Sequence, residues 1–228
     1  MSHLLGIPLE ELPFFVLAFV AGLTVHEFAH AWTAWKLGDD TAYREGRVTL
    51  NPFAHLSWLG ILFFLIAHFG WAKPVPVRRS NFRRPRLMTM LVTAAGPVSN
   101  LLLAFLGVLT VHILIAADVH MSQAGIDTFN TFMEYWLRYN MVLFLFNLIP
   151  LPPLDGYRIV EEFMPLHVRI KAMQYEQWST FIFLLIVFIP PLSAVTIGPL
   201  FSLASPIVHG MDTLLSHLFG ARPSPTLA

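Results

Sequence analysis

Near its start the sequence carries two histidines and a glutamate inside an apolar segment that is long enough to cross a membrane. Residues 12–25 contain no charged side chain, and the apolar sequence then continues through His26, Glu27 and His30. Ionisable side chains in such a segment are costly unless they are paired, bind a metal ion or face a water-filled cavity. The segment therefore predicts one membrane-spanning helix over residues 13–37, with a polar site built into it.

The polar residues follow the pattern HExxH, which here is His26-Glu27-Phe28-Ala29-His30. Positions i and i+4 lie on one face of a helix, so His26 and His30 can bind the same metal ion. Glu27 lies one position further round, where it can bind a water molecule on that metal and take its proton. The alternative is a chance match with satisfied helix histidines, but the membrane-length context favours the metal site.

The composition places the chain among multi-pass membrane proteins, with the lipid bilayer as an expected partner. Of its 228 residues, 56% are hydrophobic and 12% are charged, and the mean hydropathy is +0.63. The formal net charge is zero, so nothing suggests a nucleic-acid partner. The chain has no cysteine, which excludes disulfides and thiolate metal ligands.

Apolar length predicts an all-α polytopic membrane protein, with a three-helix core and one or two further spans. After the first span, residues 87–117 and 129–149 are each long enough to cross a bilayer. Residues 178–190 and 197–218 are weaker, proline-interrupted stretches that provide the further spans. We expect a single membrane domain over residues 1–220, with its core at 13–160 and a disordered tail at 221–228.

A small membrane-associated β element is predicted between the first two spans. Residues 47–50 alternate polar and apolar side chains, which is typical of a short strand. Pro74 and Pro76 exclude a helix but allow an edge strand. Residues 58–69 are apolar but too short to span a bilayer as a helix. We therefore expect residues 58–77 to enter or lie on the membrane and to return as a strand.

The distribution of positive charge predicts the orientation. All but one of the 14 Lys and Arg residues fall on one side of the predicted topology, and the exception is Arg138. The positive-inside rule makes that side cytoplasmic, so the N-terminus lies outside and the C-terminus inside. His30 and Asp155 then lie at the same depth, towards the cytoplasmic side.

Asp155 is the predicted third metal ligand. A catalytic zinc site needs three protein ligands and one open position, and the HExxH motif supplies two ligands. Asp155 stands in Leu154-Asp155-Gly156, just after a helix end broken by prolines. Broken helix at membrane depth is tolerated where it lines a polar cavity. The alternative for Asp155 is an ordinary turn aspartate.

Several motifs together resemble the site-2 protease family, a family of intramembrane zinc metalloproteases. The motifs are HExxH, Gly96-Pro97-Val98-Ser99-Asn100, and the stretch from Asn147-Leu148-Ile149-Pro150 to Leu154-Asp155-Gly156. Residues 46–52 and 70–77 are similar to the compact prokaryotic branch, which has no PDZ or CBS domain. The resemblance covers residues 20–159.

The resemblance implies a three-helix catalytic core with one Zn²⁺ per chain on His26, His30 and Asp155. It makes Glu27 the catalytic base, and it implies that peptide bonds are hydrolysed in or near transmembrane segments of membrane-protein substrates. A rival function is metal binding without turnover, as in a transporter or an inactive relative. Glu27 is not needed for metal binding alone, and the sequence shows no repeated halves, so both features favour the protease.

Other polar and strand positions have two roles open. Asn100 and Asn147 can hold the substrate carbonyl or its oxyanion, or they can hydrogen-bond neighbouring helices. Val75 and Val77 can pair with an extended substrate, or they can form a structural hairpin with residues 47–50. His55 can approach the metal or bind substrate, but a turn or interface histidine is favoured.

Overall fold

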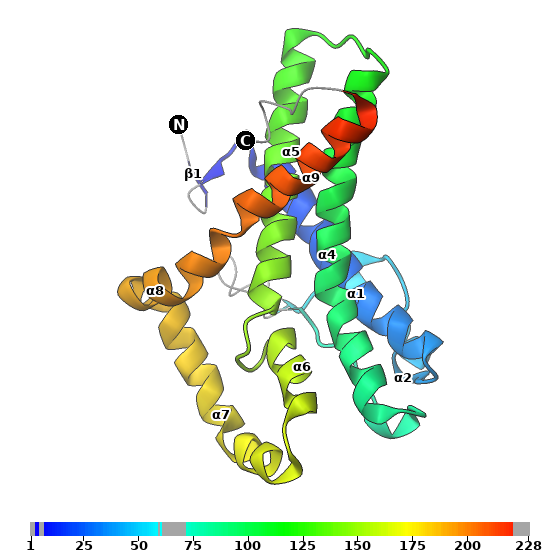
Figure 1. The fold of residues 1–228 in the computed structure, drawn as a ribbon, viewed down its shortest axis with the longest axis vertical. Helices are drawn as coiled ribbons and strands as arrows, with labels where there is room; N and C mark the ends of the chain where they lie inside the picture. Colours follow the sequence, from blue (N-terminus) through cyan, green and yellow to red (C-terminus); the bar gives the residue numbers. More distant parts are fainter. Residues whose placement is uncertain (1–2, 5–6, 59, 61–71, 221–228) are drawn as a thin grey trace.

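Three long helices form the centre of the computed structural model, which describes residues 3–4, 7–58, 60 and 72–220 (Figure 1). They are α1 (Leu12–Lys36), α4 (Pro85–Ala116) and α5 (Gln123–Asn147), and each packs against the other two. These helices confirm the three predicted core helices, although α5 begins earlier than expected. Pro13 lies in the first turn of α1, where no further N–H donor is needed. Gly38 follows its last turn with φ of +106°, which L side chains rarely adopt.

Glycines allow the core helices to approach closely. A Cβ atom on Gly22 of α1 would lie 2.9 Å from Leu143 Cδ1 and 3.1 Å from Asn140 Oδ1 on α5. A Cβ atom on Gly107 of α4 would lie 2.7 Å from Trp136 Cδ1, also on α5. Small residues at helix crossings are typical of membrane proteins, because they let backbones come together. The three helices are thereby fixed against one another around the site.

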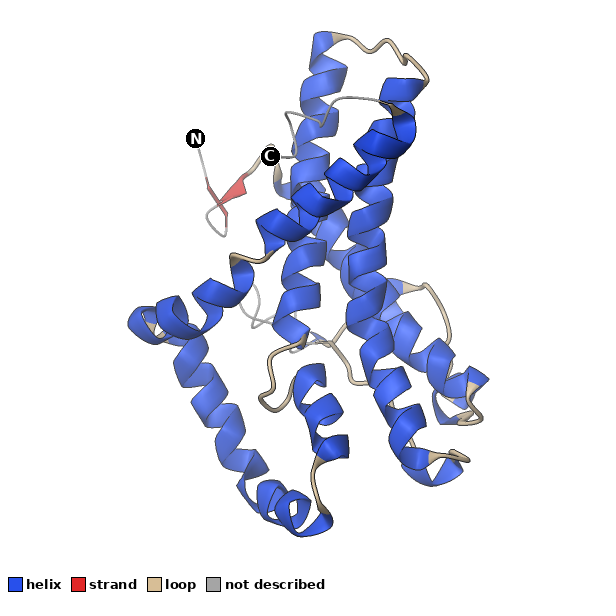
Figure 2. Ribbon diagram, in the orientation of Figure 1, coloured by secondary structure: helices blue, strands red, loops and turns tan. Residues whose placement is uncertain are grey.

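Three segments of the described chain are long and apolar enough to cross a membrane: residues 12–36, 85–116 and 190–219. The last of them joins α8 (Pro190–Phe201) to α9 (Ala204–Phe219). Helix α5 has the same length as α1, 25 residues, but its hydropathy is lowered by charged side chains such as Glu134 and Arg138. The chain is therefore an all-α, multi-pass membrane protein. Figure 2 shows that its regular secondary structure is almost entirely helical.

The C-terminal helices extend from the core. Helix α6 (Asp155–Phe163) lies against α4, and α7 (Leu166–Phe188) leads away and packs on α8 (Figure 1). Helix α9 crosses back over α4 and α5. The weaker stretch 197–218 thus lies within a membrane-length segment, whereas 178–190 covers the end of α7 and the first residue of α8. The predicted tail lies outside the described residues.

The prediction of a strand at residues 47–50 is wrong. Val48 and Thr49 form a bend, and the buried Arg47 reaches residues 73 and 74 with its side chain rather than through a backbone ladder. The segment that follows residues 47–50 and the segment that precedes residue 73 share one isolated antiparallel bridge, from Leu56 to Ala72. The structural hairpin between residues 47–50 and Val75 or Val77 is therefore excluded in the described chain.

The rest of the predicted β element is also different from expectation. Residues 73–78 have no regular secondary structure. Residues 59 and 61–71, which include most of the predicted membrane-entering element, lie outside the described residues. A two-stranded pair occurs elsewhere, where β1 (His3–Leu4) pairs antiparallel with β2 (Ile7–Pro8).

Asp39 ties the end of α1 to the segment that precedes α4. Its fully buried carboxylate accepts hydrogen bonds from the Thr41 amide and hydroxyl, the Arg78 amide at 2.6 Å and the Asn81 side-chain amide at 2.7 Å. Burial alone would raise the pKa of the Asp39 carboxyl, but these hydrogen bonds outweigh it and lower the pKa. The folded protein thus favours the ionised form of Asp39.

Asp39→Ala is expected to lower the free energy of unfolding by about 3 kcal/mol, because several buried donors lose their charged acceptor. Since the folded-state pKa is depressed, this stabilisation is present above the unfolded pKa of an aspartate and is lost as the pH falls. Thermal unfolding in detergent at neutral and acidic pH measures both effects. Asp40→Ala, at a partly exposed neighbouring carboxylate, is the control. Equal unfolding temperatures for the two variants would contradict the assignment.

Candidate metal centre

The three predicted ligands converge, although they are far apart in the chain. His26 and His30 lie one turn apart on α1, and Asp155 is the first residue of α6. The two Nε2 atoms are 3.0 Å apart, and each lies 3.1 Å from Asp155 Oδ2. One donor atom from each residue fits within a span of 4.8 Å. The structure therefore brings together both motifs that were predicted to meet at one depth.

Hydrogen bonds from α4 orient both imidazole rings. His26 Nδ1–H donates to Asn100 Oδ1 at 2.8 Å, and His30 Nδ1–H donates to the Val92 carbonyl at 2.8 Å. A ring whose Nδ1 carries the proton presents the lone pair of its Nε2. Both Nε2 lone pairs are thus available at the shared point, beside the carboxylate of Asp155.

Asn100 serves the ring of His26 in this structure. Its side chain is fully buried, and its two amide protons go to the Gly22 carbonyl at 3.0 Å and to Asn140 Oδ1 at 3.1 Å. Its oxygen accepts from His26. The amide therefore has no donor left for a substrate oxyanion, and the structure favours the helix-bonding alternative for Asn100. Asn140 was missed in the sequence, where an amide in the middle of an apolar helix was the available signal.

Asn100→Ala is expected to weaken zinc binding roughly 10–100-fold, the usual effect of losing a group that orients a metal-binding histidine. Competition with a chromophoric chelator measures the affinity. If Asn100→Ala binds zinc as tightly as the wild type but no longer cleaves peptides, Asn100 instead contacts the substrate.

Asn147 and His55 do not join the ligand group. Asn147 is half-buried and donates one amide proton to the Leu143 carbonyl, one turn back on α5. Its role on the substrate remains a prediction. His55 is fully buried, and its Nε2–H donates to the Thr49 carbonyl at 2.8 Å. The structure places His55 in a turn and outside the group of converging donors.

Gly96 makes room for the two metal-binding rings. A Cβ atom at this position of α4 would overlap His30 Nε2 and Cε1 and would lie 2.7 Å from His26 Cε1. The sequence pointed to Gly96 only as part of a motif, since the facing rings belong to a distant helix. Gly96 therefore lets α4 lie directly against the donor atoms of α1.

The donor set fits zinc. Two imidazole nitrogens and one carboxylate oxygen, all largely buried, supply the three protein ligands of a catalytic zinc site and leave one position open. Glu27 follows His26 in the same turn and is 9% exposed. The arrangement can bind a divalent metal next to a carboxylate that is not itself a ligand.

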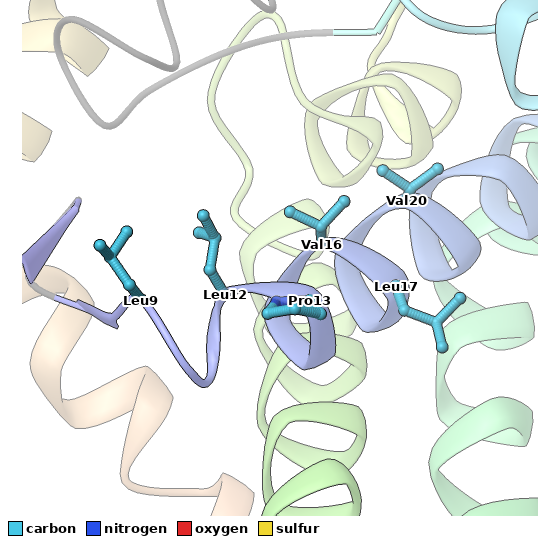
Figure 3. Close-up of a pocket in the computed structure, with 6 residues that line it drawn as sticks. All are labelled: Leu9, Leu12, Pro13, Val16, Leu17 and Val20. Atoms are coloured by element: carbon cyan, nitrogen blue, oxygen red, sulfur yellow. The ribbon is translucent and has the colours of Figure 1, made fainter.

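An open apolar pocket lies further towards the N-terminus of the same helix. It has a volume of about 510 Å³ and is lined by Leu9, Leu12, Pro13, Val16, Leu17 and Val20 (Figure 3). The side chains of Leu12, Val16 and Val20 point to one side of α1. Glu27 is seven positions after Val20, which is two helical turns, so it shares this side of the helix.

Comparisons with known proteins agree with the geometry. The profile of Peptidase family M50 matches residues 107–190, a segment that contains Asp155. The chain is 44% identical to YwhC of Bacillus subtilis strain 168, whose name describes a candidate zinc metalloprotease, and the alignment covers 100% of both chains. It is 30% identical over 180 residues to Rip2 of Mycobacterium tuberculosis H37Rv, which is named in the same way, covering 77% of this chain and 66% of Rip2. No solved structure matches the chain.

The relative YwhC, named as a zinc metalloprotease, matches this chain over its whole length, and the helix that holds His26 and His30 is of membrane length. The chain therefore belongs to peptidase family M50, the site-2 protease family of zinc metalloproteases.

Proposed function

We propose that this metalloprotease hydrolyses peptide bonds in or near the transmembrane segments of membrane proteins. The observation that carries the proposal is the position of the donor group. His26, His30 and Glu27 lie on a helix that is long and apolar enough to cross a membrane. A site built into such a helix is reached by a substrate that is itself in the membrane.

In the proposed mechanism His26, His30 and Asp155 hold one Zn²⁺ per chain. When bound, the ion polarises the attacking water and the scissile carbonyl. Glu27 takes a proton from the water as the water oxygen bonds to the carbonyl carbon. Glu27 then gives a proton to the leaving nitrogen as the C–N bond breaks. Water is thereby added across the peptide bond, which yields one carboxyl and one amino end.

The pocket on α1 supports a transmembrane helix as the substrate. Its apolar wall of Leu12, Val16 and Val20 continues on the same side of α1 towards Glu27. If a substrate helix packs against this wall, its following turns lie beside Glu27 and the metal-binding residues. A peptide bond inside a helix is shielded by its own hydrogen bonds, so the helix must unwind locally before it can react.

Residues 73–77 offer a place for the unwound chain. Exposed N–H and C=O groups are costly in apolar surroundings, and an extended backbone edge can satisfy them whatever the side chains. Val75 and Val77 are half-buried on such a segment. Asn147 can help to hold the substrate carbonyl, because only one of its amide protons goes to the protein in the described hydrogen bonds.

We also propose that the N-terminus lies outside the cell membrane and that the C-terminus and the site lie towards the cytoplasm. A cytoplasmic C-terminus requires two crossings after α5, so this orientation assigns one to α7 and one to residues 190–219. The segments between α1 and α4 and after α5 carry nearly all of the Lys and Arg residues, which supports this orientation. The site lies at the ends of α1 and α5 that join these segments.

A proteomic comparison of membranes that contain either the wild type or Glu27→Gln tests the function. We expect shortened membrane proteins, cut in or beside a transmembrane segment, to appear only with the wild type. The same fragments in both membranes, or only fragments of soluble proteins, would contradict the proposal.

Disulfide crosslinking tests the substrate edge. The chain has no cysteine, so single cysteines at Ala72, Val75 or Val77 introduce the sole thiol. In the Glu27→Gln background they should crosslink to cysteines around the scissile bond of a substrate. Crosslinks only at cysteines placed at Asn100 or Asn147 would assign the unwound chain to another surface.

A further inference from the structure

Arg47 is a buried arginine that grips backbone carbonyls. Its side chain lies in the loop after α1 and is 2% exposed. Nη1 donates to the Pro74 carbonyl at 3.1 Å, and Nη2 donates to the Lys73 carbonyl. The planar guanidinium is suited to hold two neighbouring acceptors at once, which a lysine ammonium is not. A buried arginine is rare enough that its position needs a reason.

The segment held by Arg47 stops pairing with its own chain at this point. Ala72 bridges to Leu56, and the Lys73 amide donates to the His55 carbonyl at 2.7 Å. At the next positions the guanidinium of Arg47 donates hydrogen bonds to the carbonyls of Lys73 and Pro74. The described residues then provide no backbone hydrogen bond to Val75 or Val77.

The sequence itself keeps this segment extended. Prolines at positions 74 and 76 fix their own φ angles and push Lys73 and Val75 into extended conformations. Because proline has no N–H, Val75 and Val77 supply the amide donors of the segment between Lys73 and Arg78. An extended segment with donors at alternate residues is the pattern that a partner strand requires.

The open edge runs beside the metal-binding turns of α1. Val77 packs against the cluster of Ala34, Phe82 and Val92, and the Val92 carbonyl orients His30. At the other end, burial lowers the pKa of Arg47, and the nearby carboxylates of Glu27 and Glu45 counteract this effect. The segment thus lies between the buried guanidinium of Arg47 and a hydrophobic cluster next to a metal ligand.

We propose that Arg47 is a positioning residue that ends the internal pairing at Lys73 and holds the edge of Val75 and Val77 open for the substrate backbone. The proposal rests on the proposed function, since it assigns that substrate its binding edge. Arg47 acts through the segment that it holds, so its loss weakens substrate binding and leaves the metal site intact.

The test compares Arg47→Lys with Arg44→Lys, using a fluorogenic peptide with one apolar transmembrane segment. Arg44 is the last residue of the short helix α2 (Thr41–Arg44), three positions before Arg47, but it is exposed and paired with Asp40. For Arg47→Lys we expect KM to rise roughly tenfold, the effect of losing a hydrogen bond from a charged group, with kcat and zinc content near those of the wild type. Arg44→Lys should match the wild type. Unchanged KM, or a fall in kcat alone, would overturn the proposal.

Arg47→Gln provides a second variant if Arg47→Lys does not fold, because its short neutral amide also cannot span both carbonyls. Binding of the same peptide is also measured in the Glu27→Gln background, where it is expected to weaken with Arg47→Lys and not with Arg44→Lys. This measurement does not depend on turnover. If the wild type cleaves no transmembrane peptide, the proposed function fails, whereas equal binding by both lysine variants overturns the role of Arg47.

Discussion

Glu27→Gln is expected to slow peptide cleavage about 10²–10⁴-fold, the usual contribution of a general base. Glutamine has nearly the same shape as glutamate but cannot accept the proton of the attacking water. Glu27 is not among the converging donors, so the variant should keep its fold and its zinc. The measurement is the cleavage rate of a transmembrane peptide in detergent, together with the zinc content of the same sample.

Glu45→Gln is the matched control, because Glu45 is an exposed carboxylate in the loop after α1. It should cleave at the wild-type rate. Wild-type turnover in Glu27→Gln would remove Glu27 from the mechanism. Loss of zinc from Glu27→Gln would instead mean that its carboxylate supports the metal.

Gly96→Ala is expected to remove most of the zinc and the activity by adding one methyl group. The new Cβ atom would overlap the ring of His30 at its donor nitrogen and would press on the ring of His26. Neither ring can turn away freely, because each is held through Nδ1 by a group on α4. Overpacking of this kind costs about 1–3 kcal/mol. If this cost falls on the positions of the two imidazole rings, the zinc affinity decreases roughly 5- to 150-fold.

Gly210→Ala makes the same change in another helix, where the new Cβ atom meets nothing within 4 Å. An exposed Gly→Ala change inside a helix stabilises it by about 1 kcal/mol, so the two variants should shift stability in opposite directions. Zinc titration measures the metal affinity of each variant, and thermal unfolding measures its stability. Normal zinc binding by Gly96→Ala would show that the rings are less constrained than the structure indicates.

The membrane helices and the metal ligands are predictable from the sequence because their signals are local. The length of an apolar run sets the span of α1, and the i, i+4 spacing sets the face that His26 and His30 share. Asp155 followed from the number of ligands that zinc requires, together with its position just after a helix end broken by prolines. The structure places all three together.

What the sequence could not provide were contacts between distant segments. Alternation at residues 47–50 suggested a strand, but Arg47 instead hydrogen-bonds the carbonyls of residues 73 and 74 through its side chain. Asn100 was assigned two roles, and its hydrogen bonds to α1 and α5 decide between them. The buried pair of His112 and Asp212, 2.8 Å apart between α4 and α9, had no sequence signal beyond polar residues in apolar stretches.

The zinc content of Asp155→Ala tests the central claim most directly, because Asp155 joins the site from a helix far along the chain. Mass spectrometry of the purified proteins should give one zinc per wild-type chain, and most of it should be lost in Asp155→Ala, as in His26→Ala and His30→Ala, since two ligands rarely hold catalytic zinc. Asp127→Ala, at an exposed carboxylate of α5, should keep its zinc. Full zinc occupancy in Asp155→Ala would show that the three residues do not form one metal site.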